Sequence, residues 1–185
     1  AIQVYDREGV YLRHVGLTGF DDTEGLCQYD PDRDEFAIVE EAVNEITIVT
    51  ITSATTNIVK AAGRTIATGI PVGADGLEGV TYDRAGDVFY VVQEVPMGVF
   101  RVTTNGGSVV SEELFDAGNV FDGICTDLSD LFYVPHSGHL FILSDEGNLL
   151  MECTLDGTIL AALSVAGTQP EGIAVADSGT EFYIC

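Results

Sequence analysis

Positive charge is scarce in this 185-residue sequence, in which 7 Lys and Arg residues accompany 30 Asp and Glu residues and the formal net charge is -23. Such a surface repels phosphate groups, so we expect neither nucleic acid nor anionic lipid among its partners. Divalent cations or a salty, calcium-rich medium would screen the charge. Simple adaptation for solubility is the alternative explanation of the acidic composition.

Long apolar runs are missing as well. No stretch approaches the ~20 residues that a membrane-spanning helix needs, and uncharged runs such as 46–59 are interrupted by Thr and Ser. We therefore expect no membrane span in this chain. The opening AIQVYDREGVYL looks like strand rather than signal, so we expect any export signal to lie upstream of Ala1.

Motifs of common enzymes and metal proteins are also missing. The sequence contains no GxSxG, HExxH, P-loop or dinucleotide-binding fingerprint. Its four cysteines form no CxxC pair and lie in or beside apolar runs, so we expect buried free thiols, although an even number would permit disulfides. These cysteines are Cys27, Cys125, Cys153 and Cys185.

A repeat is the main feature that the sequence does have. Each of its four copies has an acidic-Gly pair followed by an apolar run, a turn and a second apolar run. The acidic-Gly pair is degenerate in the third copy. The second apolar run ends in carboxylates in three of the copies. The copies start at Asp21, Asp75, Asp127 and Gln169. Recurrence roughly every 50 residues is typical of propellers, solenoids and arrays.

A second unit, two apolar runs around a polar turn, lies between the copies of the first, at 2–15, 45–62, 98–114 and 149–165. Asn105-Gly106 and Asp156-Gly157 are hairpin signals, because these residues tolerate a positive φ. The segments are rich in β-branched and aromatic residues, and none shows the apolar spacing of a helix. We expect almost no helix.

Together the two units predict four short antiparallel strands per repeat. We call the two strands of the first unit A and B and the two strands of the second unit C and D. Four-stranded antiparallel units of this kind predict an all-β propeller. Whole blades are expected at about 24–66, 78–115 and 127–165, with D of the first at 57–62. Half-blades are expected at 2–17 and 171–185. Residues 1–185 would then be one propeller domain holding about four blades' worth of strands and cut in mid-blade at both ends, unless the half-blades complete one another.

The segments FDDTEGLCQYDPDRDEFAIVEE, GLEGVTYDRAGDVFYVVQE, DLSDLFYVPHSGHLFILSDEGNLLMECTLDG and QPEGIAVADSGTEFYIC occur in this order and resemble the SdiA-regulated β-propeller family. The resemblance covers essentially the whole chain. It implies a ring of roughly five blades with missing pieces at both ends, in a protein of a commonly exported family. The sequence departs from the family pattern at Asp130, where the third motif usually has Gly, and Ser129 stands where the other repeats of this chain carry Glu.

Six glutamates are the candidate metal ligands. The start of strand A and the end of strand B lie at the same end of an antiparallel blade, so both sets should emerge on one face around the central channel. Repulsion among them calls for a bound cation, for protonation, or for hydrogen bonds from main-chain amides that join the blades. Oxygen ligands favour Ca²⁺ or Mg²⁺. The inner set is Glu24, Glu78 and Glu171, and the outer set is Glu41, Glu94 and Glu146.

These features predict an exported acidic propeller that binds a small ligand or a protein partner through a carboxylate-lined channel, with Ca²⁺ as the favoured cation. One alternative is a metal-dependent hydrolase of the lactonase type, for which the sequence shows no positioned base. Another is a structural subunit of an extracellular assembly, joined through its incomplete blades. His136 and His139 flank a Ser-Gly turn and are expected in an exposed turn on the opposite face.

Overall fold

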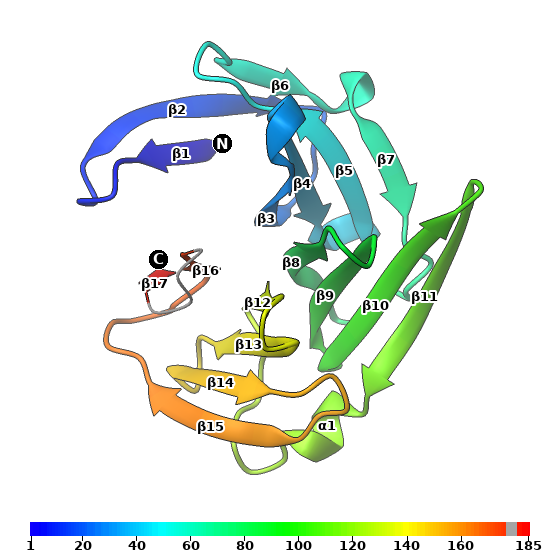
Figure 1. Ribbon diagram of the computed structural model, residues 1–185, viewed down its shortest axis with the longest axis vertical. Helices are drawn as coiled ribbons and strands as arrows, with labels where there is room; N and C mark the ends of the chain where they lie inside the picture. The colour runs from blue at the N-terminus through cyan, green and yellow to red at the C-terminus, as the bar shows by residue number, and fades with distance from the viewer. Residues whose placement is uncertain (177–180) are drawn as a thin grey trace.

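A computed structural model describes residues 1–176 and 181–185. Its strands form five sheets arranged around one axis, and the chain passes around this axis from the first sheet to the last (Figure 1). The strand nearest the axis comes first in each complete sheet and the outermost strand comes last. This is the architecture of a β-propeller, as predicted.

Three sheets have four strands each. The first of them contains β3 (Thr23–Asp30), β4 (Glu35–Glu40), β5 (Glu45–Thr50) and β7 (Arg64–Ala67). The second contains β8 (Asp75–Asp83), β9 (Val88–Val95), β10 (Gly98–Asn105) and β11 (Ser108–Phe115). The third contains β12 (Asp130–Val134), β13 (His139–Ser144), β14 (Leu149–Cys153) and β15 (Ile159–Ser164). All pairs within these sheets are antiparallel. The three whole blades predicted from the repeat are confirmed.

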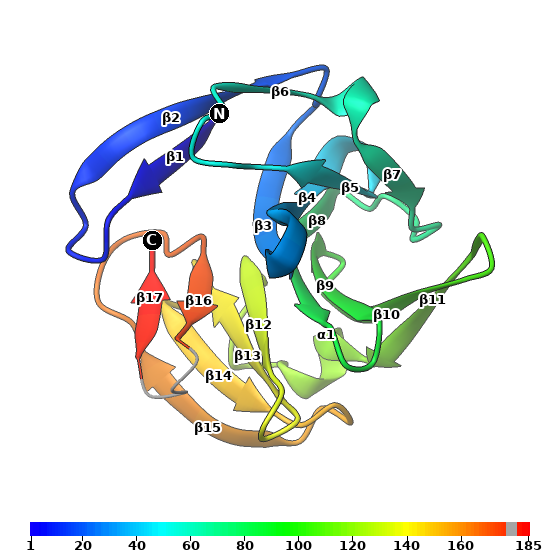
Figure 2. The ribbon, with the colours of Figure 1, turned by 45° about the horizontal axis from the view of Figure 1, so that its top comes forward.

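Two smaller sheets lie on either side of these blades, one from each end of the chain. They contain β1 (Ile2–Tyr5), β2 (Tyr11–Thr18) and β6 (Asn57–Val59), and β16 (Ile173–Val175) with β17 (Phe182–Ile184). Within the described residues the two half-blades remain separate sheets, and Figure 2 shows them on either side of the ring's opening. Whether the chain belongs to a longer five-bladed ring stays a prediction.

Helix is as scarce as the sequence indicated. Within 1–176 and 181–185 the structure has one α-helical turn, α1 (Ala117–Val120), and three 3₁₀ turns, η1 (Pro31–Arg33), η2 (Glu41–Val43) and η3 (Lys60–Ala62). No helix in these ranges is long and apolar enough to cross a membrane.

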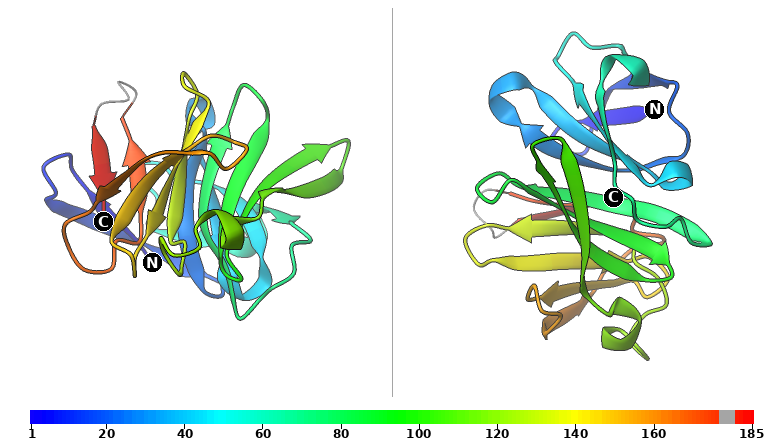
Figure 3. Two further views of the ribbon diagram at one scale, coloured as in Figure 1. Left: turned by 90° about the horizontal axis from the view of Figure 1, so that it is seen from below. Right: turned by 90° about the vertical axis from the view of Figure 1, so that its right-hand side faces the viewer.

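The hairpin predicted at Asn105-Gly106 is confirmed, since Asn105 pairs with Ser108 across a turn in which Gly106 and Gly107 have positive φ. This β10–β11 hairpin extends outward beyond the neighbouring sheets (Figure 3). Gly157 also has a positive φ in the predicted β14–β15 turn.

The strand predicted over 57–62 is wrong in its length and its partner. Only 57–59 forms a strand, and this β6 pairs in parallel with β2 of the preceding sheet. Burial of Ile58 with Val15 and Ile38 holds the segment there. The chain then turns through η3, and β7 supplies the outer strand, beginning after Gly63, which packs closely against the Ile48 carbonyl.

The core lies between the blades. Ile46 and Ile48 of one sheet pack with Leu77 and Val91 of the next, and similar clusters fill the other blade-to-blade contacts. Burial of apolar surface between blades is therefore the main stabilising contribution in this fold.

All four cysteines are free thiols, with Cys125 and Cys153 buried, Cys27 half-buried and Cys185 exposed.

Candidate functional site

The first residues of the inner strands gather at one mouth of the central channel. They line a cavity of about 270 Å³ together with residues that end or follow the second strand of a blade. We call this cavity the acidic mouth. Its lining consists of seven carboxylates and one hydroxyl: Glu24, Glu41, Asp75, Glu78, Glu94, Ser129, Asp145 and Glu171.

Glycine explains why the inner glutamates meet. A Cβ on Gly25 would lie 2.7 Å from the carbonyl oxygen of Glu78, and a Cβ on Gly79 would lie 2.6 Å from the Cα of Asp130. Because no side chain separates the inner strands there, adjacent strands approach closely. The residue before each Gly is thereby brought to the rim of the channel.

Five of the six predicted glutamates line this cavity, namely Glu24, Glu41, Glu78, Glu94 and Glu171. Glu146 does not. It accepts a hydrogen bond from the Thr126 hydroxyl and lines a neighbouring depression with Gly147. The preceding residue, Asp145, enters the acidic mouth in its place, because the turn after β13 shifts the carboxylate position by one residue.

Sequence reasoning missed three acids at this end of the channel: Asp22, Asp75 and Asp145. Asp75 opens the second copy of the motif, so the recurring acid that precedes each inner strand was an available signal. Asp22 could have been found in the same way, whereas the place of Asp145 depends on the conformation of its turn.

Four glutamates of the acidic mouth have raised pKa values. Burial, followed by the charges of Glu24, Glu41, Glu94 and Glu171, raises the pKa of Glu78 to about 8. Burial and the nearby Asp22 and Glu41 raise the pKa of Glu24 to about 7. Burial is also the first cause of the raised pKa values of Glu94 and Glu171. Among the residues that the structure describes, no Lys or Arg lines the cavity.

Asp127 and Asp145 form a coupled pair at the edge of the acidic mouth. Asp127 is buried and accepts hydrogen bonds from the Ser144 hydroxyl (2.6 Å) and the Asp145 amide (2.8 Å). Burial opposes ionisation of Asp127, but its hydrogen bonds with Asp145 and Ser144 outweigh burial and lower its pKa. The same contact with Asp127 raises the pKa of Asp145 to about 7. The two carboxyl groups therefore titrate as a pair, in which the pKa of Asp127 is lowered and that of Asp145 is raised.

The alternative in which the glutamates join blades through hydrogen bonds from main-chain amides applies to only some of the six glutamates. Glu41 Oε1 accepts a hydrogen bond of 3.1 Å from the Gly76 amide in the next blade. Among the described residues, no main-chain amide donates to the carboxylates of Glu24, Glu78 or Glu171. These three carboxylates therefore do not join blades through main-chain amides.

The geometry suits a hard cation at one side of the acidic mouth. Asp22, Glu24 and Glu41 can each offer a carboxylate oxygen within 4.8 Å of the others. A cation bound between them would contact oxygen ligands alone, the set that Ca²⁺ and Mg²⁺ prefer.

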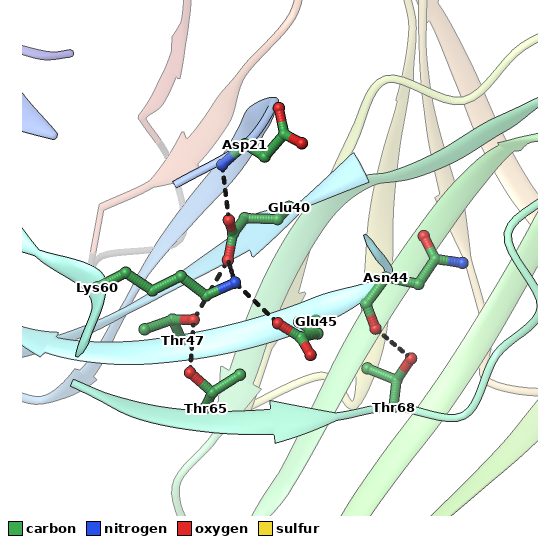
Figure 4. A network of polar contacts seen from close by, with 8 residues as sticks. All are labelled: Asp21, Glu40, Asn44, Glu45, Thr47, Lys60, Thr65 and Thr68. Carbon is green, nitrogen blue, oxygen red and sulfur yellow. Dashed lines mark hydrogen bonds and ion pairs between the residues drawn. The ribbon is translucent and has the colours of Figure 1, made fainter. Parts of the chain in front are cut away.

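Glu40, next to Glu41 in the sequence, has a different environment (Figure 4). It is fully buried, and its carboxylate lies 2.7 Å from Lys60 Nζ and accepts from the Asp21 amide at 2.9 Å. Lys60 also contacts Glu45 at 2.8 Å. The carboxylate with a counter-charge is thus buried inside a blade, and its neighbour without one faces the channel.

Asp130 stands where the other repeats have Gly, and it ties two blades together. Its Oδ2 accepts a hydrogen bond of 2.8 Å from the Ile173 amide, while its buried Oδ1 has no partner in the described residues. Burial raises its pKa to about 7, against the opposing effect of the amides of Ile173, Leu131 and Val80. Ser129, in the Glu position, donates to the Pro170 carbonyl.

The two histidines beside the Ser-Gly turn lie away from the acidic mouth, as predicted, but only His136 is exposed, because His139 is half-buried at the start of β13. His136 lines a cavity at the other end of the channel. His139 Nδ1 lies 2.7 Å from a Glu152 carboxylate oxygen of its own sheet. The described group of side chains that could hold a cation, Asp22, Glu24 and Glu41, includes neither histidine.

Comparison with known structures agrees with the propeller architecture. The chain superposes with a TM-score of 0.57 on a Bacteroides uniformis ATCC 8492 protein described as a candidate 6-phosphogluconolactonase, with 12% sequence identity over 98% of this chain. The match spans 56% of that protein. At this identity the likeness shows the fold alone.

Comparison with protein families gives a more specific result. The sequence profile of the SdiA-regulated family matches residues 1–185, the whole of the chain. The match includes all four motif copies, two of which supply Gly25 and Gly79 between neighbouring inner strands. This chain belongs to the SdiA-regulated family.

Proposed function

We propose that this propeller is a binding module whose acidic mouth holds a divalent cation, with Ca²⁺ favoured over Mg²⁺, and through it a small ligand or a protein partner. The observation that carries the proposal is a cavity whose described lining has seven carboxylates and no base. Glu24, Glu78 and Asp145 in this cavity have pKa values raised to between about 7 and about 8.

Burial and mutual repulsion together give the site its affinity for a cation. A carboxylate whose pKa is raised by burial and by neighbouring charges destabilises the folded state when it ionises, and a bound divalent cation would offset that loss. Asp22, Glu24 and Glu41 supply three oxygens on one side, and Glu78 contributes further negative charge nearby. Ca²⁺ accepts six to eight oxygens in flexible geometry, so water or a ligand group can complete the shell.

Ca²⁺ is favoured because the carboxylates come from several strands and turns, not from one preformed loop. Mg²⁺ requires near-ideal octahedral geometry and gives up its water reluctantly. We also propose that the protein works outside the cytosol, where a high calcium concentration would load such a site and screen the charge of -23.

Calorimetric titration of the chelator-treated protein with CaCl₂ and with MgCl₂ tests the cation site. We expect CaCl₂ to bind and to raise the melting temperature, because a ligand that binds only the folded state stabilises it. Glu24→Gln should weaken binding about tenfold or more, whereas Glu113→Gln, an exposed position on β11, should not. Equal calcium responses in the two variants, or no heat with either ion, would refute the proposal.

The Asp127–Asp145 pair favours hydrolysis as a second candidate function. Asp145 lies in the acidic mouth with a pKa near neutrality, which is a property of general acid–base groups. A lactonase-type reaction would use such a group beside a metal ion. Release of acid from a simple lactone such as glucono-1,5-lactone, lost in Asp145→Asn and retained in Glu113→Gln, would support this candidate over binding alone.

The third candidate, a structural subunit, rests on the strand edges of the half-blades. In the described residues β1 pairs only with β2, and β17 pairs only with β16. Unpaired edges are templates for pairing with another chain. Concentration-dependent oligomers in sedimentation would favour this candidate, and a monomer at all concentrations would count against it.

A further inference from the structure

The far end of the channel holds a second and larger cavity, of about 640 Å³, which we call the aromatic mouth. The later residues of β3, β8, β12 and β16 line it, including Gln28, Tyr29, Tyr82, Phe132 and Tyr133. The repeat that places glutamates at the start of each inner strand thus places aromatic and aliphatic side chains toward its end.

The aromatic side chains pack tightly against one another along one wall. The ring centroids of Tyr29 and Tyr82 are 4.6 Å apart, and Phe89 lies 4.6 Å from Tyr82 and 5.6 Å from Tyr29. Phe89 is almost fully buried in the core between two blades. This packing holds the wall in place.

Hydrogen bonds fix the hydroxyl groups of the same wall. Arg64 donates to the Tyr29 oxygen at 3.1 Å, and the Tyr82 hydroxyl donates to Asp87 at 2.6 Å. Burial and this bond to Asp87 raise the pKa of Tyr82, which keeps the phenol neutral. Since few of these groups must be ordered on binding, a ligand would lose little affinity to rearrangement.

The electrostatic character of the aromatic mouth differs from the charge of the whole molecule. Among residues 1–176 and 181–185 no carboxylate lines it, and its one Arg or Lys in these ranges, Arg84, lies 2.7 Å from Asp32 and 3.4 Å from Asp30. Arg84 is therefore already neutralised and is a poor anchor for an anion. The net charge of -23 further disfavours anionic ligands.

We propose that the aromatic mouth binds an uncharged small molecule with a flat apolar ring. Small-molecule sites are typically cavities of roughly 300–1,000 Å³ with mainly apolar walls and a few polar groups, and this cavity matches that description. The aromatic faces of Tyr29, Tyr82 and Tyr133 would pack against the ring. The side-chain amide of Gln28 would contribute polar contacts. This site is independent of the cation proposed at the acidic mouth.

Three dyes of different charge test the proposal with the intact chain: neutral Nile red, anionic anilinonaphthalene sulfonate and cationic thioflavin T. We expect Nile red to bind saturably with one site per chain. The anionic dye should bind at least tenfold more weakly. Thioflavin T should associate with the acidic surface in a manner that salt abolishes.

Variants then locate the Nile red site. Ala174→Phe, on β16 in the cavity wall, should weaken binding by about tenfold or more, whereas the matched Ala161→Phe on the exposed outer strand β15 should not. Glu78→Gln at the other mouth should leave binding unchanged. Gln28→Trp, an exposed lining position, repeats the test if Ala174→Phe fails to fold. No saturable Nile red binding, or equal binding by the filled-cavity and control variants, would overturn the proposal.

Discussion

The two mouths of the channel differ in whether their carboxylates are paired with basic side chains. At the acidic mouth seven carboxylates and no base line the cavity within the described part of the chain, and Glu24 and Glu78 have raised pKa values. At the aromatic mouth the nearby carboxylates Asp30 and Asp32 are paired with Arg84. With only 7 bases for 30 acids, the chain places Arg84 in the wall of one cavity and, among the described residues, no Lys or Arg in the wall of the other.

This difference indicates that the repulsion at the acidic mouth is specific to the site. Glu40, the residue before Glu41, provides the contrast: it is fully buried and is paired with Lys60. A chain that can supply a counter-charge to Glu40 but leaves Glu41 without one retains the negative potential that a cation would need. The predictions below test this contrast, from the largest expected effect to the smallest.

Removal of the counter-charge of Glu40 should have the largest effect. Lys60→Met would leave a carboxylate with no exposed surface and without its ionic partner, so we expect a loss of about 3 kcal/mol in the free energy of unfolding. This is the low end for a buried pair, because Lys60 keeps 20% of its side chain exposed. Urea denaturation measures it. The double variant Glu40→Met/Lys60→Met should recover most of the loss, and a single-variant loss well under about 1 kcal/mol would contradict the assignment.

Tight packing of the strands between the mouths should give the next largest effect. Gly79→Ala would place a Cβ 2.4 Å from Asp130 Oδ1 and 2.6 Å from Asp130 Cα, and we expect a loss of about 1–3 kcal/mol in the free energy of unfolding. The control Gly118→Ala in α1 meets no atom closer than 3.6 Å and should be neutral or slightly stabilising. Equal stability of the two variants would show that the inner strands can separate.

The pH dependence of stability should reveal the unpaired carboxylates. The pKa of Glu78 rises from 4.5 to about 8 on folding, so the folded state binds the extra proton between these values. Its contribution to stability is present below pH 4.5 and is lost as pH rises through about 8. Without divalent cations, Glu78→Gln should therefore exceed the parent in stability by about 1 kcal/mol at high pH, a figure discounted for solvent screening.

Thermal melts of the parent, Glu78→Gln and Glu113→Gln at pH values across this range provide the measurement. The advantage of Glu78→Gln should disappear at low pH and should shrink when CaCl₂ is added to the parent. A pH profile shared by Glu78→Gln and the parent would mean that Glu78 titrates normally.

Disruption of an ion pair at the aromatic mouth should have the smallest effect. Arg84 and Asp32 are both well exposed, so Arg84→Met should change the melting temperature by roughly 1 °C or less. A marked fall in melting temperature would show that the aromatic mouth also depends on charge balance, and the contrast between the mouths would weaken.

The sequence by itself determined the propeller. Its repeat, its turn residues and its strand composition predicted the three whole blades, and the hairpin at Asn105-Gly106 formed as expected. These features are local, because hairpin pairing depends on residues close together in the chain. The Glu-Gly pairs also predicted that carboxylates meet at one face, and five of the six glutamates do.

Only the tertiary structure decided the rest. Asp145 replaced Glu146 in the acidic mouth because the conformation of a turn selects the carboxylate that enters. Residues 57–59 left their own blade because burial of Ile58 between neighbouring sheets outweighed local strand continuity. Lys60 contacts a carboxylate twenty positions earlier in the sequence. Such contacts depend on packing between distant segments, and no local pattern records which charge receives a partner and which remains without one.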